Sequence, residues 1–115
     1  MSLLEAIAAG DREVLVRMLA ADVVFHSPVQ TYRGRDQVVR LLVTIGGVID
    51  DVEVTRRLED VTFFAAKVEE HPVDGVIVEQ TGKDGQTTEI TVMLRPLAQL
   101  QAAVARMARA LAERR

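Results

Sequence analysis

The last two extended segments of the chain are apolar on both faces, and this pattern constrains the fold more than any other feature. If the turn at residues 82–85 closes symmetrically, Ile77 pairs with Ile90 across a hairpin. One face of the hairpin then carries Ile77, Glu79, Ile90, Val92 and Leu94, and the other carries Val76, Val78, Thr91 and Met93. A sheet that is apolar on both sides has to be covered on both sides. We expect helices to cover one face and another copy of the chain to cover the other.

The rest of the second half is also predicted to be strand. Segments rich in β-branched and aromatic residues alternate with short polar turns, several of which contain glycine or proline. The predicted strands are residues 52–58, 62–69, 73–81 and 86–95. Pro96 ends the last of them. The result is an antiparallel sheet of four strands joined by tight turns.

Two short helices are predicted at the start of the chain. Leu3, Leu4 and Ile7 form an apolar stripe, and Gly10 is a suitable C-cap. Asp11 is a suitable N-cap for a second helix. The apolar residues of that second helix are Val14, Leu15, Met18 and Leu19. The two helices should meet at a tight corner.

A third helix is predicted after a short strand, residues 22–28, and a loop, residues 29–33. Its apolar face would consist of Val38, Leu41, Leu42, Ile45 and Ile49. The pair Gly46-Gly47 interrupts this helix near its end. A glycine in a helix interior costs about 1 kcal/mol relative to alanine. The pair therefore indicates either an early helix end or a close approach of two backbones.

A final helix is predicted from Leu97 to Glu113. Leu97, Leu100, Val104, Met107 and Leu111 follow one another at steps of three and four, which gives a narrow apolar stripe. We expect this helix to dock on its own domain or on a dimer mate. An autonomous coiled coil or a membrane-surface helix is the alternative interpretation.

Composition excludes several classes of function. With 115 residues the chain forms one domain, residues 1–115, and its net charge of -3 offers no basic surface for nucleic acid. It has no cysteine, and its two histidines lie far apart in the sequence, so we predict no metal site and no cofactor. No apolar run is long enough for a membrane span, and no signal peptide is recognisable, so we expect a cytoplasmic protein.

Several segments, taken in order, resemble the nuclear transport factor 2-like (NTF2-like) superfamily, and specifically its bacterial SnoaL-like branch. They are Ala9-Gly10-Asp11, the segment from Ala21 to Pro28, the segment from Tyr32 to Asp36, Asp74-Gly75-Val76, and the segment from Asp84 to Pro96. The resemblance implies an α+β cone, in which a curved mixed sheet wraps around the N-terminal helices and leaves a pocket at its open end. The C-terminal helix is an addition to this cone. The resemblance also implies a homodimer through the outer face of the sheet.

The resemblance allows a test for one known chemistry, that of the ketosteroid isomerase branch. That branch places a carboxylate base before the proline that ends the first strand, a neutral aspartic acid on the third strand, and a tyrosine on the first helix. The matching positions here are Ser27, Ile77 and Leu3. Serine is a poor base for a carbon-bound proton, and neither isoleucine nor leucine can donate to an oxyanion. We therefore predict that this isomerase mechanism is absent.

Three polar residues remain as candidate catalytic groups. Glu79 lies on the inferred inner face and could act as an acid or base, or it could reach water or pair with an arginine. His26 could act as a general base, but strand alternation turns it away from the cavity if Phe25 and Ser27 face inward. Tyr32 could donate to a ligand oxygen or simply cover the edge of the core.

These observations predict a pocket for a small, mostly apolar molecule. The predicted lining is Phe25, Ser27, Tyr32, Phe64, Ile77, Glu79, Ile90 and Val92. An enzyme built on it would transfer a proton or add water without a cofactor, as in an isomerase, cyclase or hydratase. The alternatives are a binding module without turnover and a structural dimer whose pocket is filled by its own side chains.

Overall fold

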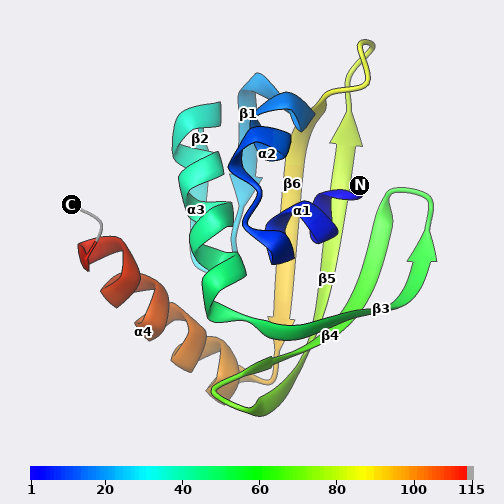
Figure 1. Cartoon of the computed structure of the whole chain (residues 1–115). Coiled ribbons are helices and arrows are strands. Elements are labelled where there is room, and N and C mark those ends of the chain that lie inside the picture. The colour runs from blue at the N-terminus through cyan, green and yellow to red at the C-terminus, as the bar shows by residue number, and fades with distance from the viewer. Residues whose placement is uncertain (114–115) are drawn as a thin grey trace.

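Four helices and six strands make up the described part of the chain, residues 1–113 of the computed structural model (Figure 1). The helices are α1 (Leu3–Ala9), α2 (Arg12–Met18), α3 (Arg35–Val48) and α4 (Leu97–Glu113). The strands are β1 (Leu19–His26), β2 (Thr31–Arg33), β3 (Asp50–Leu58), β4 (Val61–Val68), β5 (His71–Thr81) and β6 (Thr87–Arg95).

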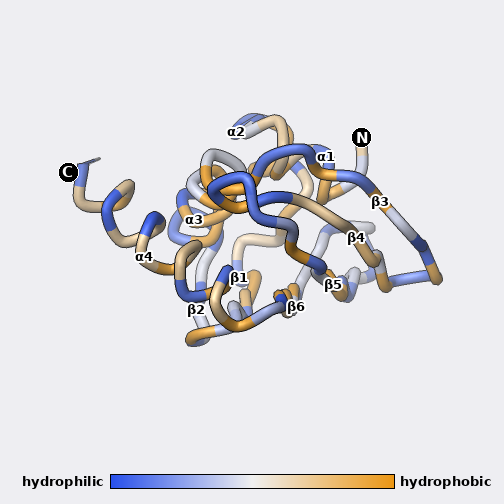
Figure 2. The backbone as a smooth tube through the Cα atoms, turned by 90° about the horizontal axis from the view of Figure 1, so that it is seen from below, coloured by the Kyte–Doolittle hydropathy of each residue, from blue (hydrophilic) through white to orange (hydrophobic). Residues whose placement is uncertain are grey.

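The six strands form one strongly curved sheet in the order β2-β1-β6-β5-β4-β3. Strands β1 and β6 run parallel, and the other neighbouring pairs run antiparallel. Figure 2 shows the sheet bending around α1, α2 and α3, with α4 beside them. The predicted α+β cone with a C-terminal helix is confirmed.

The corner between α1 and α2 forms through local capping. Ser2 and Glu5 make a reciprocal capping box at the start of α1. Gly10 adopts a left-handed conformation with φ 64° and closes the end of that helix. The Asp11 carboxylate then accepts a hydrogen bond of 3.2 Å from the Val14 backbone N–H, which starts α2. The caps at Gly10 and Asp11 were predicted from the sequence, whereas the capping box at Ser2 and Glu5 was not.

Helix α3 continues through both glycines to Val48, so Gly46-Gly47 does not mark an early helix end. A Cβ atom placed on Gly46 would lie 2.0 Å from the carbonyl oxygen of Ile7 in α1. A Cβ atom placed on Gly47 would have no heavy atom of another residue within 4 Å, apart from its chain neighbours and the backbone of its own helix. The second of the two predicted explanations, a close approach of backbones, therefore applies, and it applies to Gly46 alone.

The first strand begins three residues earlier than predicted, and the predicted loop at residues 29–33 contains a strand. Leu19 continues the helical spacing of α2, but its backbone is extended, with φ -97° and ψ 139°. It pairs with Thr87 of β6, and this pairing overrides the helical pattern. Residues Thr31–Arg33 form β2 by pairing with β1, so that Tyr32 lies opposite Phe25. A strand of three residues carries no periodic signal that the sequence could reveal.

The register of the last hairpin differs from the predicted one. Ile77 lies opposite Val92 rather than Ile90, and Ile90 lies opposite Glu79. An irregularity between Gln80 and Thr81 shifts the pairing near the turn. The shift amounts to two residues, so each side chain stays on its predicted face.

The outer face of the sheet is apolar and uncovered in the single chain. Phe63, Val76 and Met93 lie side by side across β4, β5 and β6, and Met93 is 61% exposed. Asp74 and Arg95 form an exposed ion pair of 3.1 Å next to them. The predicted cover of this face by another subunit remains a prediction.

We propose that a second copy of the chain covers this outer face, and Met93→Glu tests it. A carboxylate at the centre of an apolar interface should break the dimer, because burying an unpaired charge costs several kcal/mol. Light scattering after size exclusion should give twice 12.7 kDa for the native chain and 12.7 kDa for the variant. The control is Val16→Glu, at another exposed apolar position, on α2. A native monomer, or a Met93→Glu dimer, would contradict the proposal.

Substituting alanine at each glycine of the pair should give opposite results. Gly46→Ala forces its methyl group into the Ile7 carbonyl and should lower the free energy of unfolding by about 2 kcal/mol or more. Gly47→Ala has open space and should raise it by about 0.5–1 kcal/mol through helix propensity. Urea denaturation of both variants measures the difference. Equal effects at the two positions would rule out the close contact as the reason for glycine.

Candidate functional site

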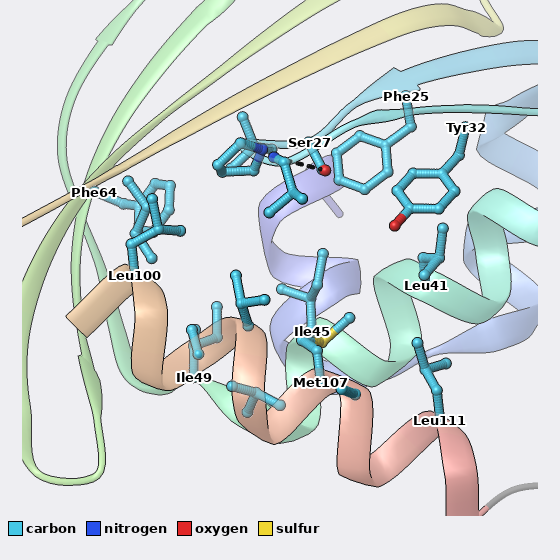
Figure 3. Close-up of a pocket in the computed structure, with 18 residues that line it drawn as sticks. Phe25, Ser27, Tyr32, Leu41, Ile45, Ile49, Phe64, Leu100, Met107 and Leu111 are labelled. Atoms are coloured by element: carbon cyan, nitrogen blue, oxygen red, sulfur yellow. Dashed lines mark hydrogen bonds between the residues drawn. The ribbon is translucent and has the colours of Figure 1, made fainter. Parts of the chain in front are cut away.

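A cavity of about 250 Å³ lies between the inner face of the sheet, α3 and α4 (Figure 3). The sheet supplies one side, through β1, β2, the turn between them, the neighbouring strand β6, and β4 further along the sheet. The two helices close the remaining sides. The side chains labelled in Figure 3 come from these elements: Phe25, Ser27 and Tyr32 from β1, β2 and their turn, Phe64 from β4, Leu41 and Ile45 from α3, Ile49 just after α3, and Leu100, Met107 and Leu111 from α4.

The C-terminal helix forms one full wall of the cavity. Leu100, Val104, Met107 and Leu111 of its apolar stripe all line the space. Two arginines hold the helix in place: Arg106 donates to the Val48 carbonyl at 3.3 Å, and Arg40 of α3 donates to the Leu111 carbonyl at 3.5 Å. The helix therefore docks on its own domain, which was one of the predicted arrangements. Leu97, the first residue of the predicted stripe, is 66% exposed and makes no part of the wall.

None of the 18 side chains that line the cavity carries a charge. Ser27 and Tyr32 are its only polar side chains. The Ser27 hydroxyl donates to the Gln30 carbonyl at 2.8 Å and accepts from the backbone N–H groups of Val29 and Gln30. The Tyr32 hydroxyl accepts a hydrogen bond of 2.8 Å from the Gln30 side-chain amide. The ring of Tyr32 stacks on Phe25, with 6.2 Å between their centroids.

Of the eight residues predicted to line the pocket, five lie at the cavity and three do not. Phe25, Ser27, Tyr32, Phe64 and Val92 line it. Ile77 and Ile90 share the inner face but are fully buried in the core that α1, α2 and α3 fill. Glu79 is also absent from the lining, because it lies near the C-terminal end of β5, away from the cavity. Strand alternation predicts which side chains point to the inner face of the sheet. It does not predict which of them the helices cover and which of them line the cavity.

Glu79 lies in a half-buried position near Arg57 and Asp60, away from the cavity. Its backbone N–H donates to the Asp60 carbonyl at 2.9 Å. Burial raises the pKa of the Glu79 carboxyl, the Arg57 guanidinium opposes this, and Asp60 adds to it. A raised carboxyl pKa suits acid-base chemistry, but this carboxyl is not next to the cavity.

His26 points away from the cavity, as strand alternation predicted. Its Nε2 atom contacts a Glu89 carboxylate oxygen, and its Nδ1 atom lies 2.9 Å from the Thr31 hydroxyl. The adjacent residues Phe25 and Ser27 face the cavity instead. Both ring nitrogens are therefore engaged on the outer side of the sheet. Of the three candidate catalytic residues, Tyr32 is the one at the cavity.

The three positions that were compared with the ketosteroid isomerase branch fall in two places. Ser27 lies at the cavity, while Leu3 and Ile77 are each 1% exposed in the core. The cavity wall therefore has no carboxyl group at any of these positions.

Sequence reasoning missed the helical walls of the cavity. Leu41 and Ile45 of α3, and the whole inward stripe of α4, line the space together with the strand residues. The sequence did show the apolar stripes of both helices, which were recognised as their buried faces. The sequence did not reveal that their inward faces stay partly unfilled.

The sequence matches the SnoaL-like domain family over residues 2–95. The chain belongs to the SnoaL-like family. This places it in the NTF2-like superfamily, as the sequence resemblance predicted. The family match ends just before Pro96, so the cavity wall formed by α4 lies outside the matched region.

Solved structures agree with this membership. A protein described as a steroid delta-isomerase from Pseudomonas aeruginosa is 34% identical with a TM-score of 0.87, and the alignment covers 96% of this chain and 86% of that one. An uncharacterised bacterial protein with a cystatin-like fold from Silicibacter pomeroyi is 28% identical with a TM-score of 0.86, covering 90% and 78%. An NTF2-like protein of unknown function from Cytophaga hutchinsonii is 11% identical with a TM-score of 0.68, covering 84% and 87%, and this likeness concerns the fold alone. No curated protein matches the sequence.

Two further features of the described residues bear on the predicted classes. None of their helices is long and apolar enough to cross a membrane. Within residues 1–113, no three histidine, aspartate or glutamate side chains gather in a way that could hold a metal ion. The expected cytoplasmic location and the expected lack of a cofactor stay predictions.

The raised pKa of Glu79 predicts a pH-dependent stability. The folded chain binds this proton more tightly than the unfolded chain, so the carboxyl lowers the free energy of unfolding as pH rises through its titration. Glu79→Gln should therefore gain stability relative to the native chain between about pH 4 and pH 7. Urea midpoints measured across this range test the trend.

Glu5→Gln provides a control with the opposite sign. Hydrogen bonds with Ser2 lower the pKa of the Glu5 carboxyl, so its stabilising effect is present above its unfolded pKa and lost as pH falls. This variant should lose stability relative to the native chain as pH rises. Parallel trends for the two variants would contradict both assignments.

Proposed function

We propose that this SnoaL-like protein binds a small, mostly apolar molecule in the cavity between the sheet, α3 and α4. The observation that supports this is the uncharged lining, in which Ser27 and Tyr32 are the only polar side chains. Pockets of this kind, concave and apolar with a few placed polar groups, are typical of small-molecule sites. An apolar ligand that fills the cavity gains affinity because its own apolar surface and that of the cavity wall are removed from water.

Binding without turnover is the function that the geometry favours. Proton transfer needs an acid or base within about 3 Å of the reacting atom, directly or through one water. Glu79 and His26 both lie away from the lining, and Tyr32 remains as the single ionisable group. A tyrosine hydroxyl can polarise a carbonyl by donating a hydrogen bond, but a hydroxyl without a partner base is a poor acceptor for a carbon-bound proton.

An isomerase is the second candidate, and the Pseudomonas aeruginosa neighbour favours it. That protein is described as a steroid delta-isomerase and is 34% identical to this chain. Sequence likeness at this level carries the fold, whereas the chemistry depends on the groups at the site. In this chain the position of the expected base holds Ser27, whose proton is already donated to the Gln30 carbonyl.

Filling the cavity should abolish binding. Ala103 is buried on α4 and lines the space, whereas Ala105, two residues along the same helix, is exposed and does not. The probe is 1-aminonaphthalene, a neutral fluorophore whose emission shifts to shorter wavelength in apolar surroundings. Ala103→Phe should weaken probe binding at least tenfold, and Ala105→Phe should leave it unchanged. A blue shift that persists in Ala103→Phe would place the probe elsewhere, and no shift in the native chain would argue against the proposed function.

Turnover is tested with a steroid β,γ-unsaturated ketone, whose conversion to the conjugated isomer raises its ultraviolet absorbance. We expect no rise above the buffer rate with the native chain. A rise that Tyr32→Phe removes would favour the isomerase and reject binding without turnover. The circular dichroism of the variant, compared with the native chain, controls for folding.

A further inference from the structure

The hydrogen bonds made by the two polar side chains of the cavity leave one hydrogen-bond donor free for a ligand. A serine hydroxyl has one donor and two acceptor positions, and Ser27 has all three occupied by Val29 and Gln30. Tyr32 accepts from the Gln30 amide, which leaves its own O–H proton without an acceptor among residues 1–113. Figure 3 shows this hydroxyl directed into the space between Phe25 and Leu41. The side chains of the wall therefore offer one donor and no free strong acceptor.

The Gln30 amide also prepares Tyr32 for this role. A hydroxyl that accepts one hydrogen bond becomes a better donor in the next, because the bonds polarise one another. The stacking of Tyr32 on Phe25 fixes the plane of its ring. The donor is therefore held in one direction before a ligand arrives, which lowers the entropy lost on binding.

The absence of charge on the wall limits the ligand further. A buried carboxylate needs a cation or several donors, and the lining provides one neutral hydroxyl proton. An alcohol would bring a donor of its own with no side-chain acceptor to receive it, and an unmet buried donor costs about 1–3 kcal/mol. A carbonyl oxygen accepts and brings no donor, so it matches Tyr32.

The volume sets the size. A cavity of about 150 Å³ holds one benzene molecule, so a cavity of about 250 Å³ holds roughly ten carbon atoms. A two-ring skeleton of this size would fit between Phe64 on one wall and Tyr32 on the other. A four-ring steroid has about twice as many carbons and would have to protrude.

We propose that the ligand is a neutral, compact ketone of roughly ten carbon atoms whose carbonyl oxygen accepts a hydrogen bond from Tyr32. This inference rests on the proposed function, because it assigns the chemical class of the molecule that the same cavity binds. The carbon skeleton supplies the affinity through its contact with the apolar wall, and Tyr32 supplies the orientation.

Four matched two-ring compounds test the inference by displacing 1-aminonaphthalene: 1-tetralone, 1-tetralol, tetralin and tetralin-1-carboxylate. One neutral hydrogen bond of about 1 kcal/mol corresponds to roughly a fivefold change in affinity. The ketone should therefore bind about fivefold tighter than tetralin. The alcohol should bind no better than tetralin, and the carboxylate should bind at least tenfold more weakly than the ketone. A steroid ketone of nineteen carbons should also bind at least tenfold more weakly.

Tyr32→Phe separates the hydrogen bond from the fit of the rings. It keeps the ring that stacks on Phe25 and removes the hydroxyl. Affinity for the ketone should fall to that for tetralin, and affinity for tetralin should stay within twofold of the native value. Tyr32 is the only tyrosine, so selective ¹³C labelling of its ring carbon at the hydroxyl gives one resonance in the spectrum. That resonance should move more with the ketone than with tetralin.

The outcomes distinguish the two proposals. If tetralin binds and the ketone binds no better, or if Tyr32→Phe keeps the preference for the ketone, this inference is wrong and the apolar pocket stands. If the carboxylate or the steroid binds best, the assigned class is wrong. If neither the fluorophore nor any compound binds the native chain, the proposed function fails as well.

Discussion

The contact between Gly46 and the Ile7 carbonyl brings α3 to backbone distance from α1, and the inner layer of the cone depends on it. Two helices usually pack 8–10 Å apart, and a side chain at the contact would push them outward. With glycine there, α3 also packs on β1 and turns Leu41 and Ile45 toward the cavity. The N-terminal helices fill the inner face around Ile77 and Ile90, and the rest of that face is left to α4.

This division of the inner face determines the chemistry of the site. Where α1, α2 and α3 meet the sheet, side chains fill the space, and Leu3 and Ile77 are core residues. Where α4 meets the sheet, apolar side chains surround an open volume with Ser27 and Tyr32 near the turn after β1. The carboxyl and imidazole groups that were candidates for acid-base chemistry lie elsewhere: the Glu79 carboxyl is near Arg57 and Asp60, and the His26 ring contacts Glu89. A site of this kind is suited to holding a molecule by shape and one hydrogen bond.

Membership of the SnoaL-like family fixes the architecture more firmly than the activity. Fold does not imply function, because function depends on the groups that the fold brings together. The chain shares 34% identity with a protein described as a steroid delta-isomerase, yet its cavity wall carries no charge. The wall formed by α4 lies beyond the matched residues 2–95, so the helix that encloses the pocket is contributed by the part of this chain outside the family match.

The sequence by itself determined the four helices, the longer strands, the caps at Gly10 and Asp11, and the face that each residue of the last hairpin occupies. These depend on periodicity and on short-range hydrogen bonds, such as those at Gly10 and Asp11, which a linear pattern contains. Five of the eight residues that it predicted for the pocket, through strand alternation, lie at the cavity. The tertiary structure alone decided the two-residue register shift near Thr81, the partner of Gly46, and the part of the inner face that stays open. The register shift lies within one hairpin, where alternation along each strand gives the face of a residue but not its partner. The other two depend on the distance between segments remote in sequence, and a residue's neighbours along the chain do not encode that distance.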